Sequence, residues 1–321
     1  MKYRTPRGLG TMLLAMGLAC GAHAAYPDKP IRFIVPYPPG GGTDVVARAI
    51  GQKLEQMWGA QVIVENKPGG DTQVGTSAVA RAPADGYTFG FITPTFAINK
   101  SLYPRLPFDP VHDFAPVAAL ARSPFFLVVG NGTKAGTLKE LIALSKAQNG
   151  NMSYSASSSI TFVTGEMFRN AAGIEALHVP YKGSAPSVTA VAGGEVAFTL
   201  DTLMATKPLV DGGLLKVLAV SSRTRFKELP HVPTLSEAGL KDFEMSFWYG
   251  MIAPAGTPAD VVEKTNAAVT RILQMPDVRA KLQSLGTEPL QTTPAQFTAM
   301  VKEDFVRYEA VVKANNLQPG S

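Results

Sequence analysis

The segment IVPYPPGGGTDVVARAIG, residues 34–51, joins a short apolar run to a helical pattern through a turn rich in proline and glycine. After the turn, Val46, Ile50 and Leu54 recur at the spacing of one helix face. Strand, turn and helix in this order build α/β proteins, whose ligands bind at the carboxyl ends of strands. The segment therefore predicts the fold class and the part of the fold where a ligand would bind.

The rest of the chain repeats this alternation of short β-branched or aromatic runs with helical patterns. Strands are predicted over 31–36, 61–65, 87–93, 125–129, 153–156, 177–181, 196–201, 215–221 and 247–253, and a final long helix over 294–316. The alternation predicts an α/β protein with mixed, mostly parallel sheets flanked by helices. The chain beyond residue 25 is large for a single core, so two lobes are expected.

The N-terminus has the pattern of a secretory signal peptide. Three basic residues precede an apolar run over 9–21, and Ala22-His23-Ala24 follows as a cleavage pattern. The run is shorter than the roughly 20 apolar residues that a permanent membrane span needs. We therefore expect residues 1–25 to be removed and the remainder to reach the periplasm. Cys20 is the only cysteine of the chain, and lipid attachment there is the less favoured alternative.

The charge of the chain gives no indication of a nucleic-acid partner. The formal net charge of +5 falls to +2 when Lys2, Arg4 and Arg7 of the signal segment are left out. Nucleic-acid binding needs lysine and arginine clustered on one face, and no long basic run occurs. No spacing of histidine, cysteine or carboxylate residues indicates a metal site, and no cofactor is expected.

Four predicted strands end in turns rich in glycine or hydroxyl side chains. Two of them share a Val-Pro-Tyr start, and two carry Thr or Ser where a helix begins. These turns are VPYPPGGGTD (35–44), ITPTFAINK (92–100), SYSASSSITF (153–162) and VPYKGSAPS (179–187). Two facing lobes with a cleft between them would bring all four together.

A helix N-terminus offers unpaired N–H groups and a partial positive charge, so it binds anions without a basic side chain. Glycines 40–42 allow close approach of the backbone to a ligand. The alternative is an ordinary strand-to-helix turn capped by Thr43 or Asp44. A nucleotide is disfavoured, because Val45 and Val46 occupy the place of a third spaced glycine and no lysine follows.

Other side chains at strand ends have two interpretations each. Asp201 could accept a hydrogen bond from a ligand amine or hydroxyl, or could cap the next turn. Lys182 is either a cation for the ligand or a solvated surface residue. Strand alternation would direct Phe247 and Tyr249 to one face and Trp248 to the other, so one face could line the cleft.

Segments along nearly the whole mature chain together resemble the solute-binding proteins of tripartite tricarboxylate transporters, the TctC or Bug family. These include YPDKPIRFIVPYPPGGGTD, VIVENKPGG, APADGYTFGFITPT, HVPYKGSAP and WYGMIAPAGTP. The resemblance implies a two-lobed, type II periplasmic-binding-protein fold of the Venus flytrap kind, closing on a small carboxylate. It also implies that the ligand is held by main-chain groups of residues 37–44 and 181–184.

The segment SASSSITFVTGE (155–166) departs from the glycine-rich, histidine-containing pattern common in that family. The bulkier and less polar wall favours an aromatic or longer-chain carboxylate, and a dicarboxylate is a further form to be considered. We therefore predict a monomeric receptor that delivers a carboxylate to membrane subunits of a tripartite tricarboxylate transporter. The alternatives are a hydrolase or lyase that uses the Ser155–Ser159 cluster and a ligand sensor for a signalling partner.

The first lobe is predicted over 26–121 and about 222–252, and the second over 122–221 and about 253–321. The sequence leaves open which of the two lobes the C-terminal helices join. The predicted ligand-binding residues are Tyr37, Pro38, Gly40, Gly41, Gly42, Thr43, Asp44, Thr93, Thr95, Phe96, Ser155, Ser157, Ser158, Ser159, Thr161, Phe162, Tyr181, Lys182, Gly183, Ser184 and Asp201.

Overall fold

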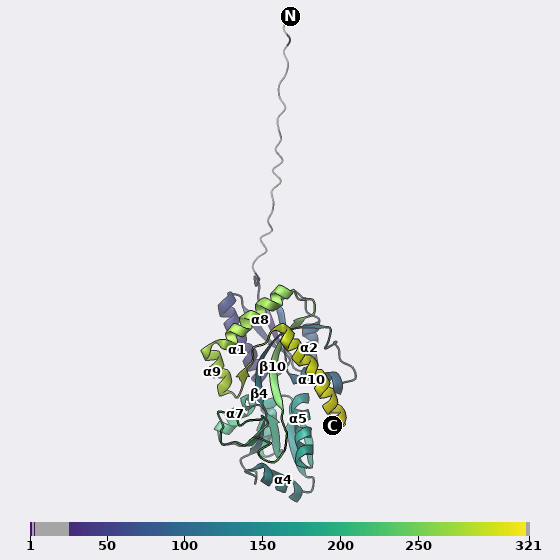
Figure 1. The fold of residues 1–321 in the computed structure, drawn as a ribbon, viewed down its shortest axis with the longest axis vertical. Coiled ribbons are helices and arrows are strands. Elements are labelled where there is room, and N and C mark those ends of the chain that lie inside the picture. Colours follow the sequence, from purple (N-terminus) through teal and green to yellow (C-terminus); the bar gives the residue numbers. More distant parts are fainter. Residues whose placement is uncertain (2, 4–25, 319–321) are drawn as a thin grey trace.

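A computed structural model describes residues 1, 3 and 26–318 of the chain. The predicted signal peptide with Cys20 therefore lies outside the described residues, apart from residues 1 and 3. The described chain forms two lobes, each built on one mixed sheet flanked by helices (Figure 1). No helix within residues 26–318 is long and apolar enough to cross a membrane.

The first lobe contains a six-stranded sheet in the order β11-β4-β10-β3-β1-β2. Its strands are β1 (Ile31–Val35), β2 (Val62–Asn66), β3 (Thr88–Ile92), β4 (Phe114–Pro124), β10 (Ser246–Pro254) and β11 (Glu288–Pro289). Its helices are α1 (Gly42–Trp58), α2 (Gln73–Ala80), α3 (Pro94–Leu102), α8 (Ala259–Gln274), α9 (Pro276–Ser284) and α10 (Pro294–Ala314). β1 pairs in parallel with β2 and β3, so the carboxyl ends of these three strands lie at the same edge of the sheet.

The second lobe contains a five-stranded sheet in the order β7-β6-β8-β5-β9. Its strands are β5 (Phe126–Gly130), β6 (Met152–Ala156), β7 (Ala176–Pro180), β8 (Phe198–Asp201) and β9 (Leu215–Val220). Its helices are α4 (Leu138–Ala147), α5 (Ser159–Ala172), α6 (Ser184–Gly193) and α7 (Leu203–Asp211). β6 pairs in parallel with β7 and β8, whose carboxyl ends carry the turns of this lobe.

The chain crosses between the lobes twice, and the crossings change the sheets from the mostly parallel form that the sequence predicted. The first crossing joins β4 to β5, and the second joins β9 to β10. Because β10 returns from the other lobe, it runs antiparallel to both β3 and β4. β5 likewise runs antiparallel to β8 and β9. Phe125 and Phe247 meet at these crossings with ring centroids 5.9 Å apart, which ties the lobes together at one side.

The C-terminal helices pack on the first lobe, which differs from the predicted division. α8 packs on β4 and α1, and α10 packs on α3 and β4. Trp248 Nε1 donates a hydrogen bond of 2.6 Å to Asp304 on α10, and its indole ring forms an edge contact with the fully buried Phe297, with ring centroids 5.6 Å apart. The apolar faces of these helices cover the open face of the six-stranded sheet, which would otherwise be exposed to water.

The segment between β9 and β10 also departs from the prediction, because much of it packs on the second lobe. Phe226 packs edge-on against Phe126 at 5.4 Å, within the apolar cluster of that lobe. Leu235 N donates to Val220 O, which extends the edge of the five-stranded sheet. The structure therefore assigns about 26–124 and 246–317 to the first lobe and about 125–245 to the second.

Candidate ligand-binding cleft

The two Val-Pro-Tyr turns meet at the interface of the lobes. A Cβ atom on Gly183 of the second lobe would lie 3.1 Å from Pro38 Cγ of the first, so the turns are in contact. Beside this contact lies a cavity of about 60 Å³, which is lined by residues of both lobes. A site for one water molecule needs roughly 10–15 Å³ on this measure, so the cavity could hold a small polar group such as a carboxylate.

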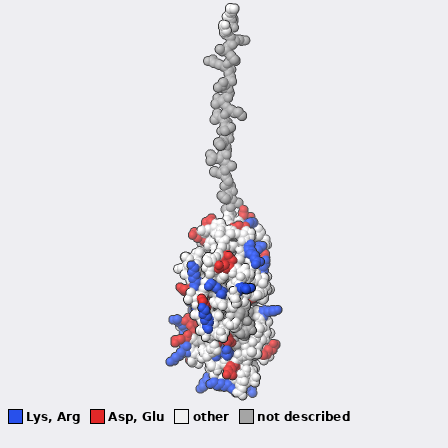
Figure 2. All heavy atoms as spheres, turned by 90° about the vertical axis from the view of Figure 1, so that its right-hand side faces the viewer, with Lys and Arg blue, Asp and Glu red and all other residues white. Residues whose placement is uncertain are grey.

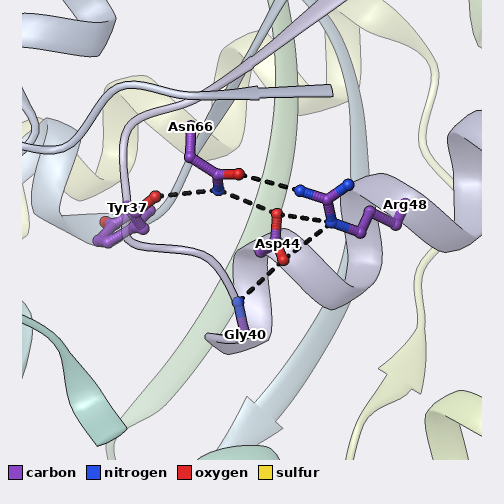
Figure 3. A network of polar contacts seen from close by, with 5 residues as sticks. All are labelled: Tyr37, Gly40, Asp44, Arg48 and Asn66. Carbon is purple, nitrogen blue, oxygen red and sulfur yellow. Dashed lines mark hydrogen bonds and ion pairs between the residues drawn. The ribbon is translucent and has the colours of Figure 1, made fainter. Parts of the chain in front are cut away.

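The first turn is held in shape by a network centred on the carboxylate of Asp44 (Figure 3). Gly40 N, Arg48 Nε and Asn66 Nδ2 donate to this carboxylate at 2.9, 3.0 and 2.9 Å, and Asn66 Nδ2 also donates to Tyr37 O at 3.1 Å. Burial by itself would raise the pKa of Asp44, but these hydrogen bonds hold it below its usual value. Asp44 therefore fixes the backbone of the turn and does not line the cavity.

Glycine is required at one position of this turn by close approach of the cavity wall. A Cβ atom on Gly42 would lie 2.5 Å from Tyr249 Oη and 3.2 Å from Met204 Sδ. Gly41 has more room, since its Cβ atom would meet only Pro38 O at 3.7 Å. Gly40 adopts a φ of 83°, a conformation that favours glycine.

Helix N-termini from both lobes face the cavity. α1 begins at Gly42 and α6 begins at Ser184, and the first two residues of each helix line the cavity. The start of α5 contributes Ser158 and Thr161. The lining contains no lysine or arginine, so the positive potential there comes from peptide N–H groups and helix dipoles. Such an arrangement can bind an anion by hydrogen bonds from the backbone.

Asp201, at the end of β8, is the one acidic residue that lines the cavity. Its Oδ1 accepts a hydrogen bond of 2.7 Å from Thr202 N, whereas its buried Oδ2 has no partner. Burial raises the pKa of Asp201 to about 6. A ligand hydroxyl or amine could supply the missing donor, and a protonated Asp201 could itself donate to a ligand oxygen.

Most of the predicted residues lie around the cavity or in a groove beside it. The cavity is lined by Tyr37, Pro38, Gly41, Gly42, Thr43, Ser157, Ser158, Thr161, Gly183, Ser184 and Asp201. The groove, of about 620 Å³, adds Ser159, Phe162, Tyr181 and Lys182. The cavity and the groove share Tyr37, Pro38, Ser157, Ser158 and Gly183, so the two spaces adjoin.

The remaining predicted residues, Gly40, Asp44, Thr93, Thr95, Phe96 and Ser155, line neither space. Thr93 Oγ1 lies 2.6 Å from Tyr37 Oη and caps α3, so it supports the turn from behind. Phe96 packs against Phe108, Phe114 and Phe305 within the core of the first lobe. Ser155 Oγ accepts from Ser187 Oγ at 2.9 Å, which joins β6 to α6.

Several residues at the site were outside the predicted set. Phe247 and Tyr249 line the cavity, on the face of β10 that strand alternation grouped together, and Thr202 lies beside Asp201. Asp71 lines the groove from the loop after β2. The signal that could have pointed to Asp71 is the Pro68-Gly69-Gly70 turn, which also follows the carboxyl end of a parallel strand. Among the described residues, no group of three or more histidine, cysteine or carboxylate side chains could hold a metal ion.

Comparison with known proteins agrees with this architecture. Residues 46–317 match the family model described as tripartite tricarboxylate transporter family receptor. Protein BugT of Bordetella pertussis is 33% identical over 310 residues, covering 95% of each chain.

Two solved structures are also similar over nearly the whole fold. R. palustris Rpa4515 with adipate is 33% identical with a TM-score of 0.89, covering 91% of this chain and 99% of that one. The periplasmic binding protein BugD is 31% identical with a TM-score of 0.87, covering the same shares of the two chains. The two-lobed periplasmic-binding-protein fold predicted from the sequence is thereby confirmed.

Proposed function

The chain belongs to the tripartite tricarboxylate transporter receptor family, and we propose that it captures a small carboxylate between its lobes and delivers it to a transporter of that type. Its relatives are solute-binding receptors and not enzymes, so the predicted role in binding is supported and a catalytic serine cluster is not. The adipate present in the similar R. palustris structure supports a carboxylate as the class of ligand.

The observation that carries the proposal is the pair of helix N-termini, of α1 and α6, that face one cavity without a basic side chain. Backbone N–H groups and helix dipoles favour an anion there. A carboxylate has two oxygen atoms that can each accept such donors, one from each lobe. Binding would therefore favour the closed arrangement, because only closure brings both sets of donors together.

The adjoining groove would take the remainder of the ligand. Its lining includes the apolar side chains of Pro36, Pro68, Leu102, Phe162 and Pro180. Phe162 packs on His178 with ring centroids 4.6 Å apart and ring planes inclined by 39°, and the two rings form one wall of the groove. This wall supports an aromatic or longer-chain carboxylate, with a dicarboxylate as the other form to be tested.

We also propose where the receptor acts and with which partner. The signal segment would direct the mature chain to the periplasm, and the transporter would be the membrane partner. The receptor would act as a monomer, without a metal or a cofactor. No nucleic-acid role is proposed, and acidic and basic side chains are interspersed over the face that Figure 2 shows.

A thermal-shift screen of the mature chain against mono-, di- and tricarboxylates, aromatic ones included, tests the proposal. A bound ligand present at a hundred times its dissociation constant should add about 2.7 kcal/mol to the free energy of unfolding. Neutral sugars and organic cations of similar size serve as controls. If the melting temperature rises with a sugar or a cation and with no carboxylate, the anion site as described does not exist.

A further inference from the structure

A carboxyl group of the first lobe already occupies the N-terminus of α5 in the second. Asp71 Oδ1 accepts a hydrogen bond of 3.1 Å from Ser159 N, and Asp71 Oδ2 accepts one from Ser159 Oγ. Ser159 Oγ also contacts Asn99 Oδ1 at 2.7 Å, and Asn99 Nδ2 donates to Asp71 O at 2.7 Å. Side chains from the loop after β2 and from α3, both in the first lobe, therefore meet the first residue of α5.

The two amide groups that directly precede α5 are also used within the protein. Ser157 N and Ser158 N both donate to Thr161 Oγ1, at 2.8 and 3.0 Å. Together with the bond from Ser159 N to Asp71, three consecutive amides are thus satisfied by side chains of the chain itself. These three amides are therefore not available to an outside anion.

The contact between Asp71 and Ser159 lies in the groove where the rest of the ligand would bind. Asp71 and Ser159 both line it, and it continues from the cavity that we propose for the carboxylate. A ligand with one carboxylate in the cavity would extend its other end past apolar side chains such as Leu102 and Phe162 toward Asp71. There it would meet carboxyl oxygen atoms and amides that already have partners.

We propose that Asp71 makes this receptor selective for ligands with one carboxylate and an apolar tail, and against dicarboxylates of the same length. The inference rests on the proposed function. A second carboxylate entering the groove would lose hydration without gaining the donors of α5, which is unfavourable for an anion. Burial raises the pKa of Asp71, but its oxygen atom holds Ser159 N–H in either protonation state, so the selectivity comes from occupied donors.

The hydroxyl of Tyr103, which also lines the groove, already contacts Asp71 Oδ2 at 3.5 Å. Two basic side chains line the groove, and neither replaces the donors of α5. Lys182 is exposed to solvent, and an ion pair at such a position contributes little to affinity. His178 packs against the ring of Phe162 as part of the apolar wall. The groove therefore favours an apolar tail over a second anion.

Matched ligand pairs test the inference by isothermal titration calorimetry on the mature chain. Hexanoate and adipate have the same carbon chain, as benzoate and terephthalate have the same ring, and the members of each pair differ by one carboxylate. The wild-type protein is expected to bind the monocarboxylate of a pair at least tenfold more tightly. Asp71→Gly should free Ser159 N–H and shift the ratio of the two affinities, monocarboxylate to dicarboxylate, at least tenfold toward the dicarboxylate.

Glycine suits this position because Asp71 has a φ of 50°, which glycine adopts without strain. Asp71→Asn keeps an oxygen atom for Ser159 N and should shift the ratio less than Asp71→Gly does. Asp85→Asn, at an exposed residue paired with Lys29, is the control and should leave the ratio unchanged.

Tighter binding of adipate or terephthalate by the wild-type protein would overturn the inference while leaving the proposed function intact. An unchanged ratio in Asp71→Gly, with the variant folded as judged by circular dichroism, would overturn it as well. If no carboxylate of either pair or of the wider screen binds the wild-type protein, the proposed function and this inference both fail.

Discussion

Gly41→Asp is expected to abolish carboxylate binding while the protein still folds. Gly41 is the N-cap residue of α1 and lines the cavity, with a φ of −75° that any residue can adopt. Its Cβ atom would meet only Pro38 O at 3.7 Å, so a side chain fits. Aspartate is a favourable N-cap residue, so the helix itself should not lose stability.

The loss of affinity can be worked from the size of the cavity. At about 60 Å³ the space is only a few ångström across, so a ligand carboxylate would lie roughly 5 Å from the new one. Two like charges at that separation, with an effective dielectric constant near 20, repel by about 3 kcal/mol, or roughly a hundredfold in affinity. The new side chain would also accept hydrogen bonds from the N–H groups of α1 that the ligand needs, which adds to the loss.

Isothermal titration with the best carboxylate from the screen measures this effect, and the melting temperature without ligand checks the fold. Gly132→Asp is the matched control, because that glycine lies in the second lobe with open space around its Cβ position. Affinities of Gly41→Asp and Gly132→Asp that both stay within threefold of wild type would refute the assignment of the anion site to the start of α1.

Two further predictions concern the walls of the same cavity. The raised pKa of Asp201, about 6 against an ordinary value of 3.8, means that the folded state binds a proton more tightly than the unfolded state. The tighter proton binding destabilises the fold as pH rises from about 4 to 6, by roughly 3 kcal/mol in total. In urea unfolding, Asp201→Asn should therefore be more stable than wild type at pH 7.5 but not at pH 4. Equal differences between the two proteins in the free energy of unfolding at pH 7.5 and pH 4 would contradict the raised pKa of Asp201. Gly42→Ala should destabilise by about 1–3 kcal/mol, because its methyl group would overlap Tyr249 Oη, whereas Gly41→Ala should cost less than 1 kcal/mol. Thermal unfolding compares the two variants, and equal losses of stability would show that Tyr249 moves to make room for the methyl group.

The sequence predicted the elements of the fold better than their partners. Each of the nine predicted strands appears within two residues of its expected ends, because period-two and period-3.6 patterns are local signals. β4 was missed, since its run of small residues, including Ala118, Ala119 and Ala121, has low β-propensity. It is a strand because β10 and β11 supply hydrogen-bonding partners on its two sides.

For the turn over residues 35–44, the sequence alone argued against a nucleotide, because glycine spacing and the absence of a lysine are properties of the chain itself, and a backbone anion site there stays a prediction. Which side chains surround that site was a matter of tertiary structure. Asp44 lies next to the glycines in sequence, yet it turns to Arg48 and Asn66 and away from the cavity. Asp71 and Ser159 are 88 residues apart and meet only because the lobes face each other. Local pattern determines which backbone forms a helix N-terminus, but long-range packing decides whether a ligand or the protein's own carboxyl group occupies it.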